Sequence, residues 1–113
     1  MKEREEKVYV HMTFFKAKGG KMDQLRKLYF DEVIPASKAH NGIRFVHLLE
    51  CLDSEHEGIS ITAWDKKGDL EAFQKSEDFK RMRRNLMELF ADEPVPKSYQ
   101  VTASSEPLIL RIF

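Results

Sequence analysis

An alternating run that ends in the single tryptophan of the chain constrains the fold most strongly. Residues 59–65 read ISITAWD, in which every second side chain is apolar up to Trp64. This two-residue period is typical of a β-strand whose two faces differ. A second strand-like run at 43–53 precedes it, and the turn SEHEG at 54–58 separates the two. The pair predicts an antiparallel hairpin.

Helical patterns lie on both sides of this hairpin. The first covers 21–34 with an apolar stripe, and we expect Pro35 to interrupt it. The second begins with a short helix around Leu70 and Phe73 and continues in a longer helix that Ser76 caps. The apolar residues of the first stripe are Met22, Leu25, Leu28, Tyr29 and Val33.

Further strands expected at 7–15 and 98–103 complete the pattern. The order β-α-β-β-α-β predicts a ferredoxin-like α+β fold with an antiparallel sheet and both helices on one face. A short fifth strand is expected at 108–113. We expect one domain over 1–113, with a disordered tail at 1–6 and a C-terminal extension at 104–113.

The two faces of the expected sheet differ in polarity. We expect an apolar set to pack under the helices. The opposite, mixed set is too polar for a dry core and too aromatic for open water. Contact between two such faces predicts a homodimer through the sheet, with a partly polar cavity between sheet and helices. The apolar set in strand 59–65 is Ile59, Ile61 and Ala63; the mixed set is Tyr9, His11, Thr13, Phe15, Ser60, Thr62 and Trp64.

Composition narrows the classes of function. Lys and Arg together number 19, as do Asp and Glu, so the basic excess of a nucleic-acid-binding protein is absent. No apolar run approaches the ~20 residues of a membrane-spanning helix. Cys51 is the only cysteine, which excludes a disulfide within the chain. We therefore expect a cytoplasmic protein without a nucleic-acid or membrane partner.

The run ISITAWDKKGDLEAFQKSEDFKRM at 59–82 resembles a known family. It combines a strand ending in Trp64, a charged turn, a short helix and the motif Ser-x-x-Phe at the start of the last helix. With GIRF at 42–45 and GGK at 19–21, the chain resembles the antibiotic biosynthesis monooxygenase domain family over about 7–103. The resemblance implies a dimeric α+β barrel. Members include cofactor-free oxygenases of aromatic polyketides or quinols, haem-degrading enzymes, a sugar isomerase and many proteins without known activity.

The haem-degrading branch of that family has its own signature. Those members use an Asn on strand one, a Trp on the short helix and a His on the last helix that ligates iron. Counted from Trp64, the corresponding positions fall near Met12, on Phe73 and on Arg83. The usual axial ligand is therefore missing. The resemblance thus disfavours haem degradation, and we expect neither a metal nor another cofactor.

Two histidines and an arginine are the candidates for chemistry. His11 lies on the mixed face and could take a phenolic or enolic proton as general base. His47 lies on strand 43–53, on a face that the sequence does not decide, and is a candidate substrate contact. In KRMRR at 80–84, Arg84 is expected to hold an anion at the cavity mouth, with Arg83 as the alternative. Each of these residues also has an ordinary structural explanation, as a strand histidine or part of a solvated helix face.

Aromatic and hydroxyl side chains complete the expected site. Trp64 is expected to anchor the end of the sheet and to form the wall against which a planar substrate stacks. The residues expected to orient the substrate through hydrogen bonds are Tyr9, Thr13, Tyr29, Ser60 and Thr62.

The function stays open between two hypotheses. The first is a cofactor-independent monooxygenase of a small aromatic, polyketide or quinol-type substrate, in which a substrate carbanion or phenolate donates an electron to oxygen. The alternative is a non-catalytic small-ligand-binding or stress-related dimeric barrel. A haem-degrading monooxygenase comes third.

Overall fold

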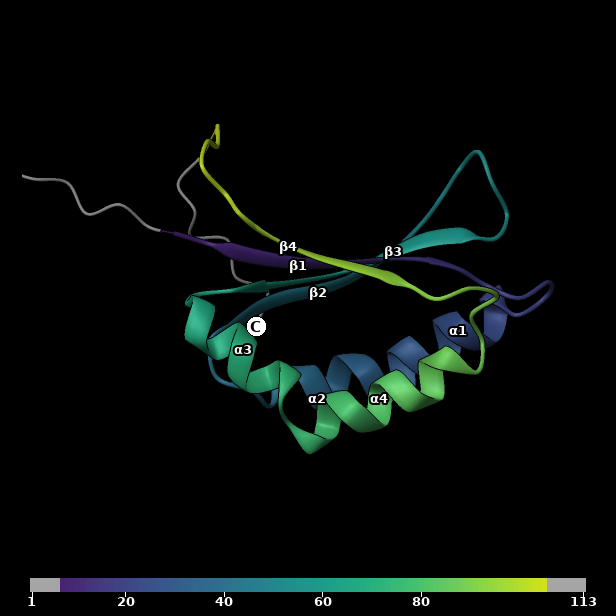
Figure 1. The fold of residues 1–113 in the computed structure, drawn as a ribbon, viewed down its shortest axis with the longest axis horizontal. Coiled ribbons are helices and arrows are strands. Elements are labelled where there is room, and N and C mark those ends of the chain that lie inside the picture. The colour runs from purple at the N-terminus through teal and green to yellow at the C-terminus, as the bar shows by residue number, and fades with distance from the viewer. Residues whose placement is uncertain (1–6, 106–113) are drawn as a thin grey trace, which may run out of the picture.

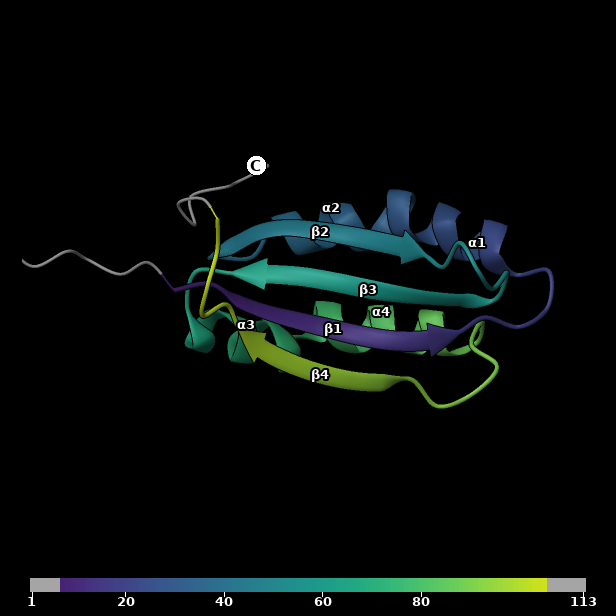
Figure 2. The same ribbon diagram turned by 90° about the horizontal axis from the view of Figure 1, so that it is seen from above.

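Four antiparallel strands form one sheet in the computed structural model, which describes residues 7–105. The strands are β1 (Tyr9–Lys16), β2 (Ile43–Glu50), β3 (Glu57–Trp64) and β4 (Val95–Gln100). Their order in space is β2-β3-β1-β4 (Figure 2). β2 and β3 pair as the predicted hairpin. The strand expected at 108–113 lies outside the described residues.

All helices lie on one side of this sheet, as predicted (Figure 1). A long helical segment joins β1 to β2 and consists of α1 (Met22–Leu28), the π-helical turn η1 (Tyr29–Val33) and α2 (Ile34–Lys38). After β3 the chain forms α3 (Lys67–Gln74) and α4 (Glu77–Met87). This arrangement confirms the predicted ferredoxin-like α+β fold.

The prolines do not break the elements in which they lie. Pro35 lacks an N–H, and in a regular α-helix its ring would clash with the carbonyl of Asp31. The wider turn η1 ends at Val33, two residues before Pro35, and gives the ring room, so the helix continues to Lys38 and the predicted interruption is wrong. Pro96 is accommodated in β4 because this is an edge strand, where a missing N–H costs least.

The mixed face of the sheet packs against the helices, which corrects the expectation that the apolar set would lie there. Trp64 is fully buried and Phe15 is buried, and both belong to a cluster that includes Leu25, Phe73 and Met82 from the helices. The ring centroids of Trp64 and Phe73 lie 4.9 Å apart. These large aromatic side chains supply the volume that fills the space between the two layers.

The apolar set lies on the face that no helix covers (Figure 1). Helices cover only the other face, so the apolar character of this face does not come from packing against a helix. The buried residues of this helix-free face are Val8, Val10, Ile61 and Ala63, with Met12, Phe45, Ile59 and Val101 packed against them.

Replacing Trp64 should test its role as the anchor of the core. Trp64→Ala should lower the free energy of unfolding by about 3–5 kcal/mol, because it removes a fully buried ring and leaves a cavity. Urea denaturation followed by circular dichroism measures this loss. Leu52→Ala, at a fully exposed position, is the control and should change stability by less than about 0.5 kcal/mol. Equal stabilities of the two variants would contradict the assignment.

Candidate functional site

A cavity of about 270 Å³ lies between the sheet and the helices. Its floor is formed by His11 and Thr13 from β1 and by Ser60 and Thr62 from β3. The structure therefore brings together four of the residues that the sequence marks as candidates. This volume is close to the lower end of the range for ligand pockets, about 300–1,000 Å³, and suits a molecule of one or two rings.

His11 is the titratable group of the cavity floor. Its Nδ1 lies 3.0 Å from Ser98 Oγ and 3.4 Å from Gln74 Nε2. Burial lowers the pKa of His11 below its ordinary value of 6.5, so the imidazole is neutral at pH 7. When Nδ1–H donates to Ser98, Nε2 keeps a lone pair that can accept a proton. The ring then has the tautomer that a general base requires.

The long helical segment forms one wall of the cavity. Leu25, Tyr29, Val33 and Ser37 line this wall at four-residue intervals. In a regular α-helix such a row drifts around the axis by about 40° at each step. The π-helical turn η1 has more residues per turn and cancels part of this drift. Ser37 therefore stays on the same wall as Leu25.

Two polar groups interrupt this otherwise apolar wall. Burial raises the pKa of the Tyr29 hydroxyl above its ordinary value of 10, so it remains protonated and neutral. Ser37 is fully buried, and its Oγ has no hydrogen-bond partner among the described residues. An unpaired buried hydroxyl costs about 1–3 kcal/mol. Ser37 is thus a polar group without an internal structural explanation.

The opposite wall belongs to α3 and α4. Gln74, Phe79, Met82 and Arg83 are among its lining residues. Arg83, rather than the predicted Arg84, is the arginine at the cavity. Because each residue of an α-helix is rotated by about 100° from the last, these two neighbours point in different directions.

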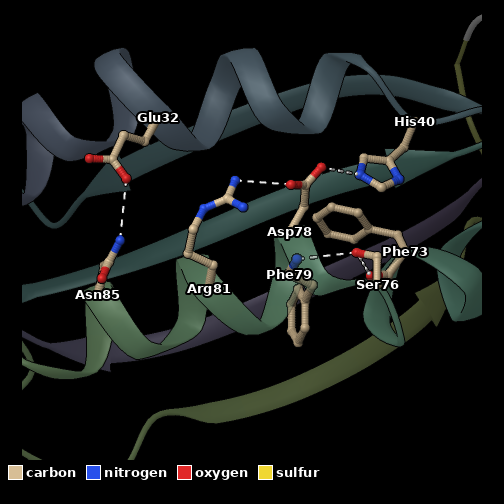
Figure 3. Close-up of polar contacts among 8 residues, drawn as sticks. All are labelled: Glu32, His40, Phe73, Ser76, Asp78, Phe79, Arg81 and Asn85. Atoms are coloured by element: carbon tan, nitrogen blue, oxygen red, sulfur yellow. Dashed lines mark hydrogen bonds and ion pairs between the residues drawn. The ribbon is translucent and has the colours of Figure 1, made fainter.

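Two polar contacts join α4 to the long helical segment and to the turn that follows it (Figure 3). His40 Nε2 donates to the Asp78 carboxylate at 3.0 Å, and Asn85 Nδ2 donates to Glu32 at 3.3 Å. Asp78 also accepts a hydrogen bond from Arg81, and the bonds from His40 and Arg81 lower the pKa of Asp78. These contacts tie the two helical walls together.

Three of the predicted binding residues lie outside the cavity lining. Trp64 lies beside the floor, on the same face of β3, where its Nε1 donates to Thr62 Oγ1 at 2.8 Å. Tyr9 packs against the same core. His47 lies on the helix-free face, and its ring stacks on Phe45 with centroids 4.5 Å apart. The geometry therefore separates His47 from His11 and assigns Trp64 to the core beside the site.

Sequence reasoning misses two polar cavity residues, Ser37 and Gln74. Ser37 follows Val33 by four residues, so a lone hydroxyl that continues the apolar stripe is the signal for it. The expectation that Pro35 ends the helix conceals this signal. Gln74 carries no comparable signal, because its contact with His11 depends on how α3 packs against the sheet.

The three positions compared with haem-degrading enzymes do not lie on the same side of the sheet. Phe73 and Arg83 line the cavity, whereas Met12 packs on the helix-free face. Within residues 7–105 no three His, Cys, Asp or Glu side chains form a cluster that could hold a metal ion. No helix in the described part of the chain combines the length and the apolar character of a membrane span.

The sheet, the helical layer and the cavity between them define an α+β ferredoxin-like domain. Residues 8–85 match the family described as antibiotic biosynthesis monooxygenase, and the chain belongs to this family, as the sequence motifs predict. A comparison with curated proteins gives no match.

Several solved structures share the fold. A protein from Nitrosomonas europaea, described as a candidate antibiotic biosynthesis monooxygenase, is 14% identical with a TM-score of 0.74, covering 86% of this chain and 92% of that one. Rv0793 from Mycobacterium tuberculosis is 18% identical with a TM-score of 0.74, covering 88% and 99% of the two chains. PA3566 from Pseudomonas aeruginosa is 21% identical with a TM-score of 0.67, covering 91% and 100%. At these identities the similarity establishes the fold.

Titration of His11 should make the protein less stable in mild acid. Because the folded state lowers the pKa of His11, the unfolded chain binds its proton first, and stability falls as the pH drops below about 6.5. His11→Asn should flatten this slope between roughly pH 7.5 and 5. Urea denaturation of both proteins across that range measures the difference. Parallel stability curves would contradict the buried neutral imidazole.

Proposed function

We propose that the cavity binds a small aromatic, polyketide or quinol-type molecule and that the protein is a cofactor-independent monooxygenase. The neutral His11 on the cavity floor, with Nδ1 bonded to Ser98, carries this proposal. A neutral imidazole beside an apolar cavity is suited to take a proton from a phenol or enol. Membership in the family supports the same class of reaction.

The proposed reaction begins with the base and ends with water. His11 removes the proton of a substrate hydroxyl and leaves an electron-rich phenolate. The phenolate donates one electron to O₂, and the two radicals combine to a peroxide anion. The proton held by His11 converts this anion to a hydroperoxide. Loss of water, formed from the outer peroxide oxygen with its hydrogen and the hydrogen of the same ring carbon, leaves one oxygen atom in the product. One quinol and one O₂ thus give one hydroxyquinone and one water.

Other cavity residues would position the substrate in this scheme. The hydroxyls of Thr13 and Ser60 offer hydrogen bonds from the floor. The guanidinium of Arg83 would favour a substrate carboxylate or the negative charge that develops on the peroxide. Arg83 thereby takes the role that the sequence assigns to Arg84.

A non-catalytic ligand-binding role is the second candidate, and one contact favours it. Gln74 Nε2 approaches His11 Nδ1 at 3.4 Å, and an Nδ1 that accepts this bond leaves the proton on Nε2. His11 would then donate a hydrogen bond to the ligand instead of taking a proton from it. The two functions therefore require opposite tautomers of His11.

Oxygen consumption with a panel of quinols and hydroxynaphthalenes distinguishes these functions. We expect uptake of O₂ and incorporation of one ¹⁸O atom from labelled O₂ into the product, since a monooxygenase transfers one atom and reduces the other. His11→Asn should reduce kcat/KM by about 10²–10⁴-fold, the usual contribution of a general base. His56→Asn, in the exposed turn before β3, is the matched control. Binding without O₂ uptake would contradict the monooxygenase activity and support the non-catalytic ligand-binding role.

We also propose that two copies pair through their sheets to form a dimeric α+β barrel. The helix-free face supports this, because its central residues are apolar while Val95 and Tyr99, at its β4 edge, are about half exposed. The pairing surface is thus the apolar set, not the mixed set that the sequence suggests. We further propose a single cytoplasmic domain, in which the exposed thiol of Cys51 suits a reducing compartment.

Introducing a charge on the helix-free face should disrupt this dimer. Met12→Lys should shift the mass in solution from two chains to one, because a buried unpaired ammonium opposes association. Size-exclusion chromatography with light scattering reports the mass. Phe30→Lys, at an exposed position of η1, is the control and should leave the mass unchanged. A wild-type protein that is monomeric at micromolar concentration refutes the proposal.

A further inference from the structure

Ser37 is the polar group of the cavity that the proposed reaction leaves unused. It is fully buried and lines the cavity, and its Oγ has no hydrogen-bond partner in the described chain. A helical serine can satisfy its hydroxyl by bonding back to a carbonyl one turn earlier, but Ser37 does not. Because buried polar groups are nearly always paired, a molecule in the cavity is the natural partner for this hydroxyl.

Ser37 and His11 lie on different sides of the cavity. Ser37 belongs to α2, which packs over β2, whereas His11 belongs to β1 (Figure 2). Because β3 separates these strands, they are two strand spacings apart, or about 10 Å across the sheet. One ligand atom cannot meet both groups, so a molecule that satisfies both needs two separate polar atoms.

The surroundings of Ser37 define the chemistry of its partner. Tyr29 on the same wall is kept neutral by burial, and no carboxylate among residues 7–105 lines the cavity. Arg83, the single charged lining residue in the described part of the chain, belongs to the opposite wall. The atom that meets Ser37 is therefore an uncharged oxygen, either a hydroxyl or a carbonyl.

We propose that Ser37 is a second hydrogen-bonding subsite, by which the cavity selects aromatic molecules with oxygen substituents on opposite edges. One oxygen meets His11 and the other meets Ser37. Aromatic diols and quinones satisfy both groups, whereas compounds with one oxygen leave Ser37 unpaired. The inference takes the location of the ligand from the proposed function but does not require catalysis.

Two naphthalene compounds test this selectivity directly. 2,6-Dihydroxynaphthalene and 2-naphthol share one ring system and differ by a single hydroxyl. Titration calorimetry without oxygen should show roughly five- to tenfold tighter binding of the diol to the wild type, the effect of one hydrogen bond. Ser37→Ala should weaken binding of the diol and bring the two dissociation constants within about twofold of each other. Ser54→Ala, before β3 and outside the cavity lining, should keep the preference.

Stability and oxygen uptake separate the possible outcomes. Ser37→Ala should not lower the Tm, because it removes an unpaired hydroxyl, whereas a serine with a structural role would lose stability. The inference is overturned if Ser37→Ala keeps the preference, or if the wild type binds neither compound or binds both equally. Tighter binding of the diol without O₂ uptake supports the Ser37 subsite and contradicts the monooxygenase activity. O₂ uptake without tighter binding of the diol supports the monooxygenase activity and contradicts the subsite.

Discussion

The contact between Trp64 and Phe73 joins the two layers of the molecule at the point where the chain passes from one to the other. β3 ends at Trp64, α3 begins at Lys67, and Phe73 returns over the indole ring. Gln74, the next residue, is thereby held beside His11. On the sheet side the same indole donates to Thr62, which forms part of the cavity floor. The geometry of the site therefore depends on the contact between Phe73, which lines the cavity, and Trp64, which lies beside the lining.

Local patterns in the sequence are sufficient for the elements and for part of the site. The two-residue period places Thr62 and Ser60 on one face, and the pairing of β1 with β3 brings His11 and Thr13 beside them. Periodicity alone does not say which face meets the helices, because both faces contain large apolar side chains. That choice depends on how the helical layer fills its space, which is a property of the whole fold.

Two other features of the site depend on how far a helix is rotated about its axis. Arg83 and Arg84 differ by about 100° of rotation on α4, less than the precision with which a sequence pattern orients a helix. Ser37 reaches the cavity only because η1 widens the helix before Pro35. A π-helical turn is rare and has no reliable sequence signal, although such turns are frequent at functional sites.

The cavity reduces the stability of the fold that surrounds it. A buried neutral histidine and an unpaired serine are both unfavourable for the free protein, and an entirely apolar filling would be more stable. Sites that bind other molecules commonly show this conflict between stability and function. A ligand that pairs with these groups would recover part of the lost stability.

β1 presents His11 to the cavity and its neighbours Val10 and Met12 to the helix-free face, so one strand serves two surfaces. Because its side chains alternate, inserting or deleting one residue within β1 would exchange the two sets and damage both surfaces together. The connection at 51–56, where Leu52 is fully exposed, has no such constraint. During evolution, changes in chain length should therefore accumulate in this connection while the length of β1 stays the same.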